Sequence, residues 1–151
     1  TTEIYTLSLH DALPISQVKA MKKIAGSLRL DLASARELEA FAQLGTELDK
    51  ATQGQLDRGR RMVELLKQNQ YTPFHIVDQV ISIYAGTQGL LDSVDLKDVR
   101  EFEAKLLDSF RTINKPVWDE LNTKRALDAD MEKKLKAAIG AFKSSFKPGA
   151  K

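Results

Sequence analysis

The stretch from residue 51 to residue 73 constrains the fold most, because a helix start, a helical period and a helix stop agree there. Thr52 and Gln55 fit a capping box, in which the hydroxyl and the carboxamide satisfy the first backbone amides. Apolar residues then recur at helical spacing; they are Leu56, Met62, Val63, Leu65 and Leu66. Thr72–Pro73 disfavours continuation, since the residue before a proline is pushed out of the helical region. The sequence predicts a helix from about Thr52 to Lys67.

A polar turn follows this helix. Gln68, Asn69 and Gln70 place three carboxamides beside the ring of Tyr71. Such residues are common in ordinary surface loops. They can also line a pocket for a planar, hydrogen-bonding ligand. The residues alone favour the surface loop and leave the pocket as the alternative.

The rest of the chain after residue 16 shows the helical period and no sustained strand alternation. Asp95 and Asp128 are the expected caps of two helices, and Gly26–Ser27 is expected to separate the first two. Phe41 and Ile113 are among the residues expected on buried faces. Besides the helix above, the expected ranges are 18–25, 28–44, 76–85, 95–113, 116–121 and 128–146. The sequence therefore predicts an all-α fold, a helical bundle of about six to seven helices with short loops.

Composition limits the classes of protein that fit. The chain has 151 residues, enough for one domain with its own core, and no cysteine, which excludes disulfides and thiol chemistry. The net charge is only +2, but residues 124–151 hold eight Lys or Arg against three Asp or Glu. A solvated helix face explains such a tail, and an anion-binding surface is the alternative. No apolar run approaches the roughly 18 residues needed to cross a bilayer, so we expect no direct membrane insertion.

Motifs that would carry catalysis are absent from the sequence. There is no GxxxxGK[ST] phosphate loop, no GxGxxG turn and no His/Glu pair at metal spacing. His75 stands without a second ligand and suits a helix start, and His10–Asp11 lacks a nucleophile. Glu101 and Glu103 are two residues apart on a helix and face away from each other. We therefore predict no catalytic residue and no metal site in this chain.

Residues 1–16, TTEIYTLSLHDALPIS, do not continue the helical pattern. Apolar and polar residues alternate from Ile4 to Leu9, and Pro14 would stop a helix. The string resembles the translation of a sequencing adapter. We expect residues 1–16 to be a non-native or disordered segment, residues 17–147 to form the helical domain, and residues 148–151 to fray.

Three phrases after Gln17 are distinctive in combination: KAMKKIAGSLRLDLA, LDKATQGQLDRGRRMVELLKQNQYTP and IYAGTQGLLD. In this order and spacing the chain resembles the C-terminal helical domain of the alpha subunit of the rotary F-type ATP synthase. The resemblance covers most of the chain and weakens after Phe110.

The resemblance implies a role inside a larger assembly. In that family, alpha alternates with beta around a central gamma shaft and holds a non-catalytic ATP with magnesium. Gln68 and Gln70 would then lie near the adenine in the intact subunit, which favours the pocket interpretation of the turn. The implied interface with neighbouring subunits and the shaft comprises Tyr84, Gly86, Gln88, Gly89, Asp92 and Asp95. The implied location is peripheral, on the cytoplasmic face of the bacterial inner membrane.

The sequence departs from the family just before Gln17. The family has its arginine finger there, whereas residues 12–16 read ALPIS. The phosphate loop and the magnesium-binding residues, which the family carries upstream, are missing as well. Arg29 and Arg36 lie past the motif and do not replace the finger. We expect a truncated alpha subunit, soluble, without a cofactor of its own and inactive alone.

Two alternatives belong to other classes. A stand-alone basic helical module could bind nucleic acid through Lys19, Lys22, Lys23 and the C-terminal lysines, with binding that weakens steeply in salt. The interspersed Asp and Glu argue against it, and we expect no nucleic-acid partner. The second alternative is a helical adaptor unrelated to the synthase.

Overall fold

The computed structural model of the chain describes residues 17–44, 48–69 and 71–149. These residues form six α-helices and one 3-10 helix, and none of them is in a strand. The elements are α2 (Lys19–Gln43), α3 (Lys50–Leu65), α4 (Ile76–Thr87), η1 (Leu96–Asp98), α5 (Val99–Arg111), α6 (Lys115–Lys124) and α7 (Ala129–Ser145). The predicted all-α bundle is confirmed. The predictions for residues 1–16 and for Gln70 lie outside the described residues, and the division into 1–16, 17–147 and 148–151 stays a prediction.

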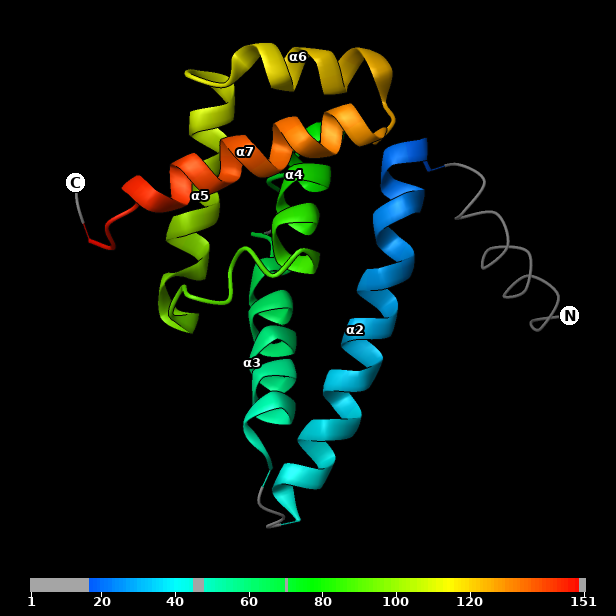
Figure 1. Ribbon diagram of the computed structural model, residues 1–151, viewed down its shortest axis with the longest axis vertical. Coiled ribbons are helices and arrows are strands. Elements are labelled where there is room, and N and C mark those ends of the chain that lie inside the picture. Colours follow the sequence, from blue (N-terminus) through cyan, green and yellow to red (C-terminus); the bar gives the residue numbers. More distant parts are fainter. Residues whose placement is uncertain (1–16, 45–47, 70, 150–151) are drawn as a thin grey trace, which may run out of the picture.

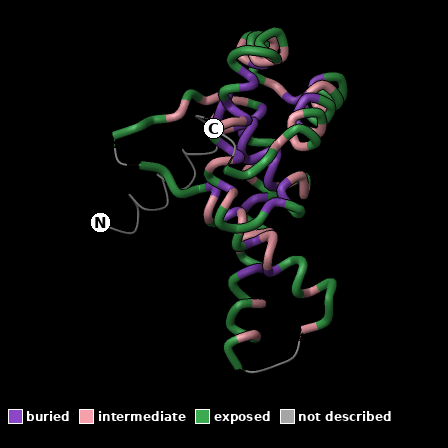
Figure 2. The backbone as a smooth tube through the Cα atoms, turned by 90° about the vertical axis from the view of Figure 1, so that its left-hand side faces the viewer, coloured by how far each residue is buried: buried purple, intermediate pink, exposed green. Residues whose placement is uncertain are grey.

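The helices form a compact body and a projecting hairpin. Helices α2 and α3 run antiparallel, and their connected ends extend beyond the other helices (Figure 1). Helix α6 crosses one end of the body, and α7 lies across α4 and α5. Figure 2 shows buried residues gathered in the body and mostly exposed residues along the hairpin. The projecting end of the hairpin is therefore mostly exposed, whereas the parts of α2 and α3 inside the body contribute to the core.

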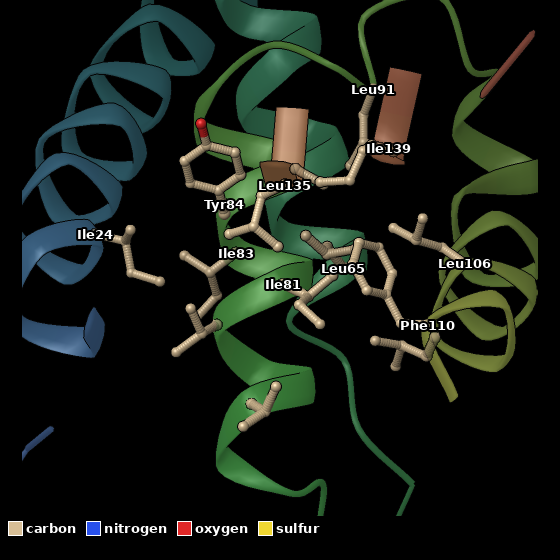
Figure 3. Packing of buried hydrophobic residues seen from close by; sticks show 14 of the residues in the cluster. Ile24, Leu65, Ile81, Ile83, Tyr84, Leu91, Leu106, Phe110, Leu135 and Ile139 are labelled. Atoms are coloured by element: carbon tan, nitrogen blue, oxygen red, sulfur yellow. The ribbon is translucent and has the colours of Figure 1, made fainter. Parts of the chain in front are cut away.

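Helix α4 is the centre of the core. Residues from Val77 to Gly86 are buried, with the half-buried Gln79 as the exception, so the prediction that α4 is the most buried element is confirmed. Figure 3 shows Ile81 and Tyr84 of α4 among side chains from α2, α5 and α7. A helix that is apolar on nearly all sides is stabilised by partners on several faces.

One helix, α2, replaces the two helices predicted for residues 18–44. The predicted break at Gly26–Ser27 is wrong, because α2 runs through it without interruption. A mid-helix glycine costs about 1 kcal/mol relative to alanine. Met21, Ile24 and Leu28 are buried on one face across the break, and burial of side chains this size outweighs that cost.

Helix α3 begins earlier and ends earlier than predicted. The predicted Thr52–Gln55 capping box is wrong, because the cap is Asp49. Its carboxylate accepts hydrogen bonds from the Ala51 amide at 3.2 Å and from the Thr52 hydroxyl. Two residues of the predicted buried stripe face solvent instead, Val63 at 50% exposure and Leu66 at 44%.

The second half of the chain follows its predicted signals more closely. Asp128 caps α7 by accepting from the Met131 amide at 2.7 Å, as predicted. Asp95 precedes the 3-10 helix η1 and makes no side-chain cap, so that prediction is wrong. Ile113 lies beyond the end of α5 and is 82% exposed, and Phe41 on the hairpin is 56% exposed, against the prediction for both.

Candidate functional site

The turn between α3 and α4 is a surface feature. Gln68 is exposed, and its Nε2 donates to the Thr72 carbonyl. The Thr72 hydroxyl donates to the Asn69 carbonyl at 2.7 Å, which closes the turn. Tyr71 has a φ of 63° and is 90% exposed, and non-glycine residues rarely adopt this left-handed backbone. The predicted partner of Gln68, Gln70, lies outside the described residues.

An open groove of about 450 Å³ lies between this turn and α5, and Gln68 is part of its lining. Its apolar lining comes from Phe74, Ala104 and Leu107, and its cationic lining from Lys67, Arg100 and Arg111. Arg100 Nη2 donates to Asn69 Oδ1 at 2.9 Å, which ties α5 to the turn. Its volume is in the range of about 300–1,000 Å³ that small-ligand pockets occupy. An apolar wall surrounded by cations, carboxamides and the carboxyl groups of Glu103 and Asp108 suits the edge of a planar, hydrogen-bonding ring.

A buried carboxylate orients one of the groove's arginines. Asp78 of α4 is 0% exposed and accepts from Trp118 Nε1 of α6 at 2.8 Å. It also forms an ion pair with Arg111 at the end of α5. The His75 ring lies tilted against Trp118 with centroids 5.0 Å apart. Its Nδ1 accepts from the Val77 amide, so the predicted helix-start role of His75 is confirmed. Asp78 thus fixes α5 and α6 against the start of α4.

Two carboxyl groups line the groove, those of Glu103 and Asp108, and the one of Glu103 is mostly buried. Glu103 of α5 is 6% exposed, and burial raises its pKa, while the nearby Ser82 hydroxyl and Arg100 oppose that shift. Ser82 Oγ is buried and has no hydrogen-bond partner of ordinary geometry among the described residues. The raised pKa makes Glu103 easier to protonate than an exposed glutamate.

The predicted interface segment from Tyr84 to Asp95 is buried at its start and exposed further on. Tyr84 and Gly86 are buried in α4, and the Tyr84 hydroxyl donates to the Glu132 carbonyl of α7 at 3.3 Å. Burial, and then the Glu132 charge, raise the pKa of Tyr84. The remaining predicted residues are exposed or half-buried: Gln88, Gly89, Asp92 and Asp95. Only these four reach a surface where another molecule could touch them.

Two arginines of α3 hold this segment, and the sequence analysis singled out neither of them. Arg58 forms a two-pronged ion pair with Asp92, with Nε to Oδ1 at 3.1 Å. Arg61 Nε donates to the Val94 carbonyl at 2.7 Å. These partners lie more than 30 residues away in the sequence, so no local spacing pointed to them.

Two lysines of the basic C-terminal stretch form ion pairs with carboxylates on α6 and α7. Lys124 and Lys134 both pair with Glu120, at 2.7 and 2.9 Å, and Lys134 also pairs with Asp130 at 2.7 Å. The hydrogen bonds to Asp130 and Glu120 raise the pKa of Lys134. These pairs fit the solvated helix face predicted for the stretch better than the anion-binding alternative.

The described part of the chain contains neither a metal-binding cluster nor a membrane-spanning helix. No group of three or more His, Asp or Glu side chains is placed there to hold a metal ion. None of its helices has both the length and the apolar character that a membrane crossing requires.

Comparison with known proteins gives one consistent match. Residues 17–142 match the family described as ATP synthase alpha/beta chain, C terminal domain. The ATP synthase subunit alpha of Desulfovibrio desulfuricans is 53% identical over 131 residues, which are 87% of this chain and 26% of that protein. That of Aquifex aeolicus is 50% identical over 133 residues, 88% of this chain and 26% of that protein. That of Mycolicibacterium smegmatis is 49% identical over 131 residues, which are 87% of this chain and 24% of that protein. The chain spans about a quarter of the length of these curated relatives.

Proposed function

This chain belongs to the ATP synthase alpha/beta C-terminal domain family, and from that premise we propose that it works as the C-terminal helical domain of an alpha subunit in a rotary proton-translocating synthase. The observation that carries the proposal is the identity of about half of the residues to three alpha subunits over nearly the whole helical region. In this role the domain packs against neighbouring subunits while ATP synthesis proceeds at sites that other segments build.

The turn after α3 is proposed to face the adenine of a nucleotide held by the intact subunit. Gln68 is exposed, and its carboxamide lies at the rim of the groove whose wall includes Phe74. A carboxamide can donate and accept at the edge of a base. The groove is open to solvent and cannot enclose a whole nucleotide, so the phosphates and magnesium belong to other parts of the subunit. Gln70 is proposed for the same role from the resemblance alone.

The segment from Gln88 to Asp95 is proposed to face the other subunits of the synthase, beta and the gamma shaft. Gln88, Asp92 and Asp95 are exposed on it. Tyr84 and Gly86 would then support that surface from beneath. The location proposed for the whole assembly is the cytoplasmic face of the bacterial inner membrane, with this domain peripheral to the bilayer.

A chimeric alpha subunit tests the proposal. In it, residues 17–147 replace the matching part of a relative's alpha subunit, and the tightly held nucleotide is counted after gel filtration. We expect Gln68→Ala to lower that retained nucleotide several-fold. Gln53→Ala is the matched control, because Gln53 lies on α3 and its side chain donates to Asp57 at 3.0 Å, away from the turn. Equal retention by the two variants would contradict the role given to the turn.

A further inference from the structure

The segment from Gln88 to Asp95 has a defined shape although it contains no helix or strand. Backbone hydrogen bonds run from the Asp92 amide to the Gly89 carbonyl at 3.2 Å and from the Val94 amide to the Leu91 carbonyl at 2.9 Å. Leu91 and Val94 are buried, at 1% and 6% exposure. Figure 1 shows the segment as the light-green connection between α4 and α5. Its apolar side chains anchor it inward and leave its polar side chains outward.

Arg58 of α3 fastens the middle of this segment. Its guanidinium meets the Asp92 carboxylate with both prongs, the geometry in which arginine binds carboxylates most specifically. The hydrogen bonds to Asp92 raise the pKa of Arg58. Gly89 lies beneath this pair with a φ of 69°, and a Cβ there would lie 2.8 Å from Arg58 Nη2 and 2.9 Å from Asp92 Oδ2. Glycine at this position therefore makes room for the ion pair as well as for the turn.

Arg61 fastens the end of the same segment. Its Nε donates to the Val94 carbonyl at 2.7 Å in a partly buried contact. Arg58 and Arg61 are three residues apart on a helix, so they project from the same face of α3. Two guanidinium groups from one rigid helix thus bond the segment at positions two residues apart.

We infer that Arg58 and Arg61 are positioning residues that hold Gln88–Asp95 on α3 in one conformation, ready for contact with another subunit. The inference rests on the proposed function, which makes this segment an interface. A surface that is already ordered loses less conformational freedom on binding than a mobile loop does. Neither arginine needs to touch the partner for this effect.

Amide hydrogen exchange on the whole 151-residue chain tests the clamp. We expect Arg58→Ala and Arg61→Ala to speed exchange of the Asp92 and Val94 amides about tenfold through local opening, while α4 and α5 keep their rates. Arg60→Ala is the matched control, because Arg60 pairs with Glu39 at 3.6 Å and not with the segment. Arg58→Lys keeps the charge without the two-pronged geometry and should protect the segment only in part.

Two exchange results would overturn the clamp. One is that the segment exchanges at the parent rate in both Arg58→Ala and Arg61→Ala, or that Arg60→Ala speeds its exchange as much as those two variants do. The other is exchange that rises evenly over the chain, which would indicate loss of overall stability and no local role for the arginines. If Arg58→Lys protects the amides of the segment as fully as the parent does, the role given to the two-pronged geometry of Arg58 and Asp92 is overturned.

The chimeric alpha subunit tests the link to function. We expect Arg58→Ala in the chimera to weaken its assembly with beta and gamma subunits about tenfold, with the nucleotide retained by the alpha subunit unchanged. If Arg58→Ala loosens the segment but the chimera still assembles as well as the unmutated one, the inference is overturned. Failure of the unmutated chimera to assemble would instead contradict the proposed function, so the two failures are distinguishable.

Discussion

Gly59 of α3 lies against Ala35 of α2 so closely that a Cβ on Gly59 would overlap the Ala35 side chain. This contact is the tight point of the α2–α3 hairpin, and both residues are buried. Small residues at a crossing let two helices approach closely, and the distance between helix axes depends on the side chains at the contact. The hairpin that carries Arg58 and Arg61 therefore depends on a residue without a side chain.

The first prediction compares two glycines in the hairpin. Gly59→Ala should lower the free energy of unfolding by about 1–3 kcal/mol, because overpacking displaces one helix. Gly26→Ala should raise it by up to about 1 kcal/mol, because a Cβ at Gly26 meets nothing within 4 Å. Urea unfolding followed by circular dichroism measures both. Equal effects of the same sign would contradict the packing described at the crossing.

The second prediction concerns the buried carboxylate of Asp78. Arg111→Ala should lower the free energy of unfolding by about 3 kcal/mol, because it leaves a buried charge without its cation. Asp78→Asn in the same chain should recover part of that loss, since no buried charge then remains. Arg60→Ala, which breaks an exposed ion pair with Glu39, is the control and should stay within about 0.5 kcal/mol of the parent. Stability of Arg111→Ala within that same limit would show that the ion pair has no structural role.

The third prediction is a pH dependence set by Glu103. Burial raises its folded-state pKa, so the folded protein loses stability as the pH rises from the unfolded pKa of about 4.3 through the folded one. Glu103→Gln removes that loss. It should match the parent at pH 3.5 and exceed it at pH 7 by about 1 kcal/mol, the scale of an uncompensated buried polar group. Melting curves over this pH range provide the measurement.

Glu101→Gln is the control for the pH experiment. Its hydrogen bond with Lys105 lowers the pKa of Glu101, so its charge favours the folded state and the variant should gain nothing at pH 7. Parallel pH profiles for Glu103→Gln and the parent would show that Glu103 titrates alike in the folded and unfolded states.

The fourth prediction concerns nucleotide. The isolated chain, given ATP and magnesium, should show no hydrolysis and no tight binding, because the groove beside Gln68 is open on one side. Isothermal titration calorimetry and a phosphate-release assay measure the two quantities. Binding with a micromolar Kd would mean that the helical domain alone builds a nucleotide site.

Sequence reasoning succeeded where the signal is local. The helical periods and the cap at Asp128 each depend on residues within one or two turns. It failed at Gly26–Ser27, where an unfavourable local preference is outweighed by side chains buried against distant helices. It also failed at Ile113, because the helix that would have turned this residue inward ends at Arg111.

The candidate site was predictable only in part. The turn with Gln68 was predicted because its polar residues follow a helix with clear sequence signals and are followed by Pro73. The groove was not, because Glu103 and Arg111 reach it only after α5 packs beside the turn. The clamp on Asp92 was missed for the same reason, since an ion pair between distant residues leaves no periodic pattern.

The central claim is that this chain is the helical domain of an alpha subunit and acts only within the synthase. The most direct measurement is the ATP hydrolysis rate of complexes assembled from the chimeric alpha subunit with the beta and gamma subunits of the relative that supplies the rest of alpha. The account predicts assembled complexes whose rate is within a few-fold of complexes made with that relative's own alpha subunit. A chimera that folds, shown by its circular dichroism and cooperative melting, but fails to assemble or to hydrolyse ATP would contradict it.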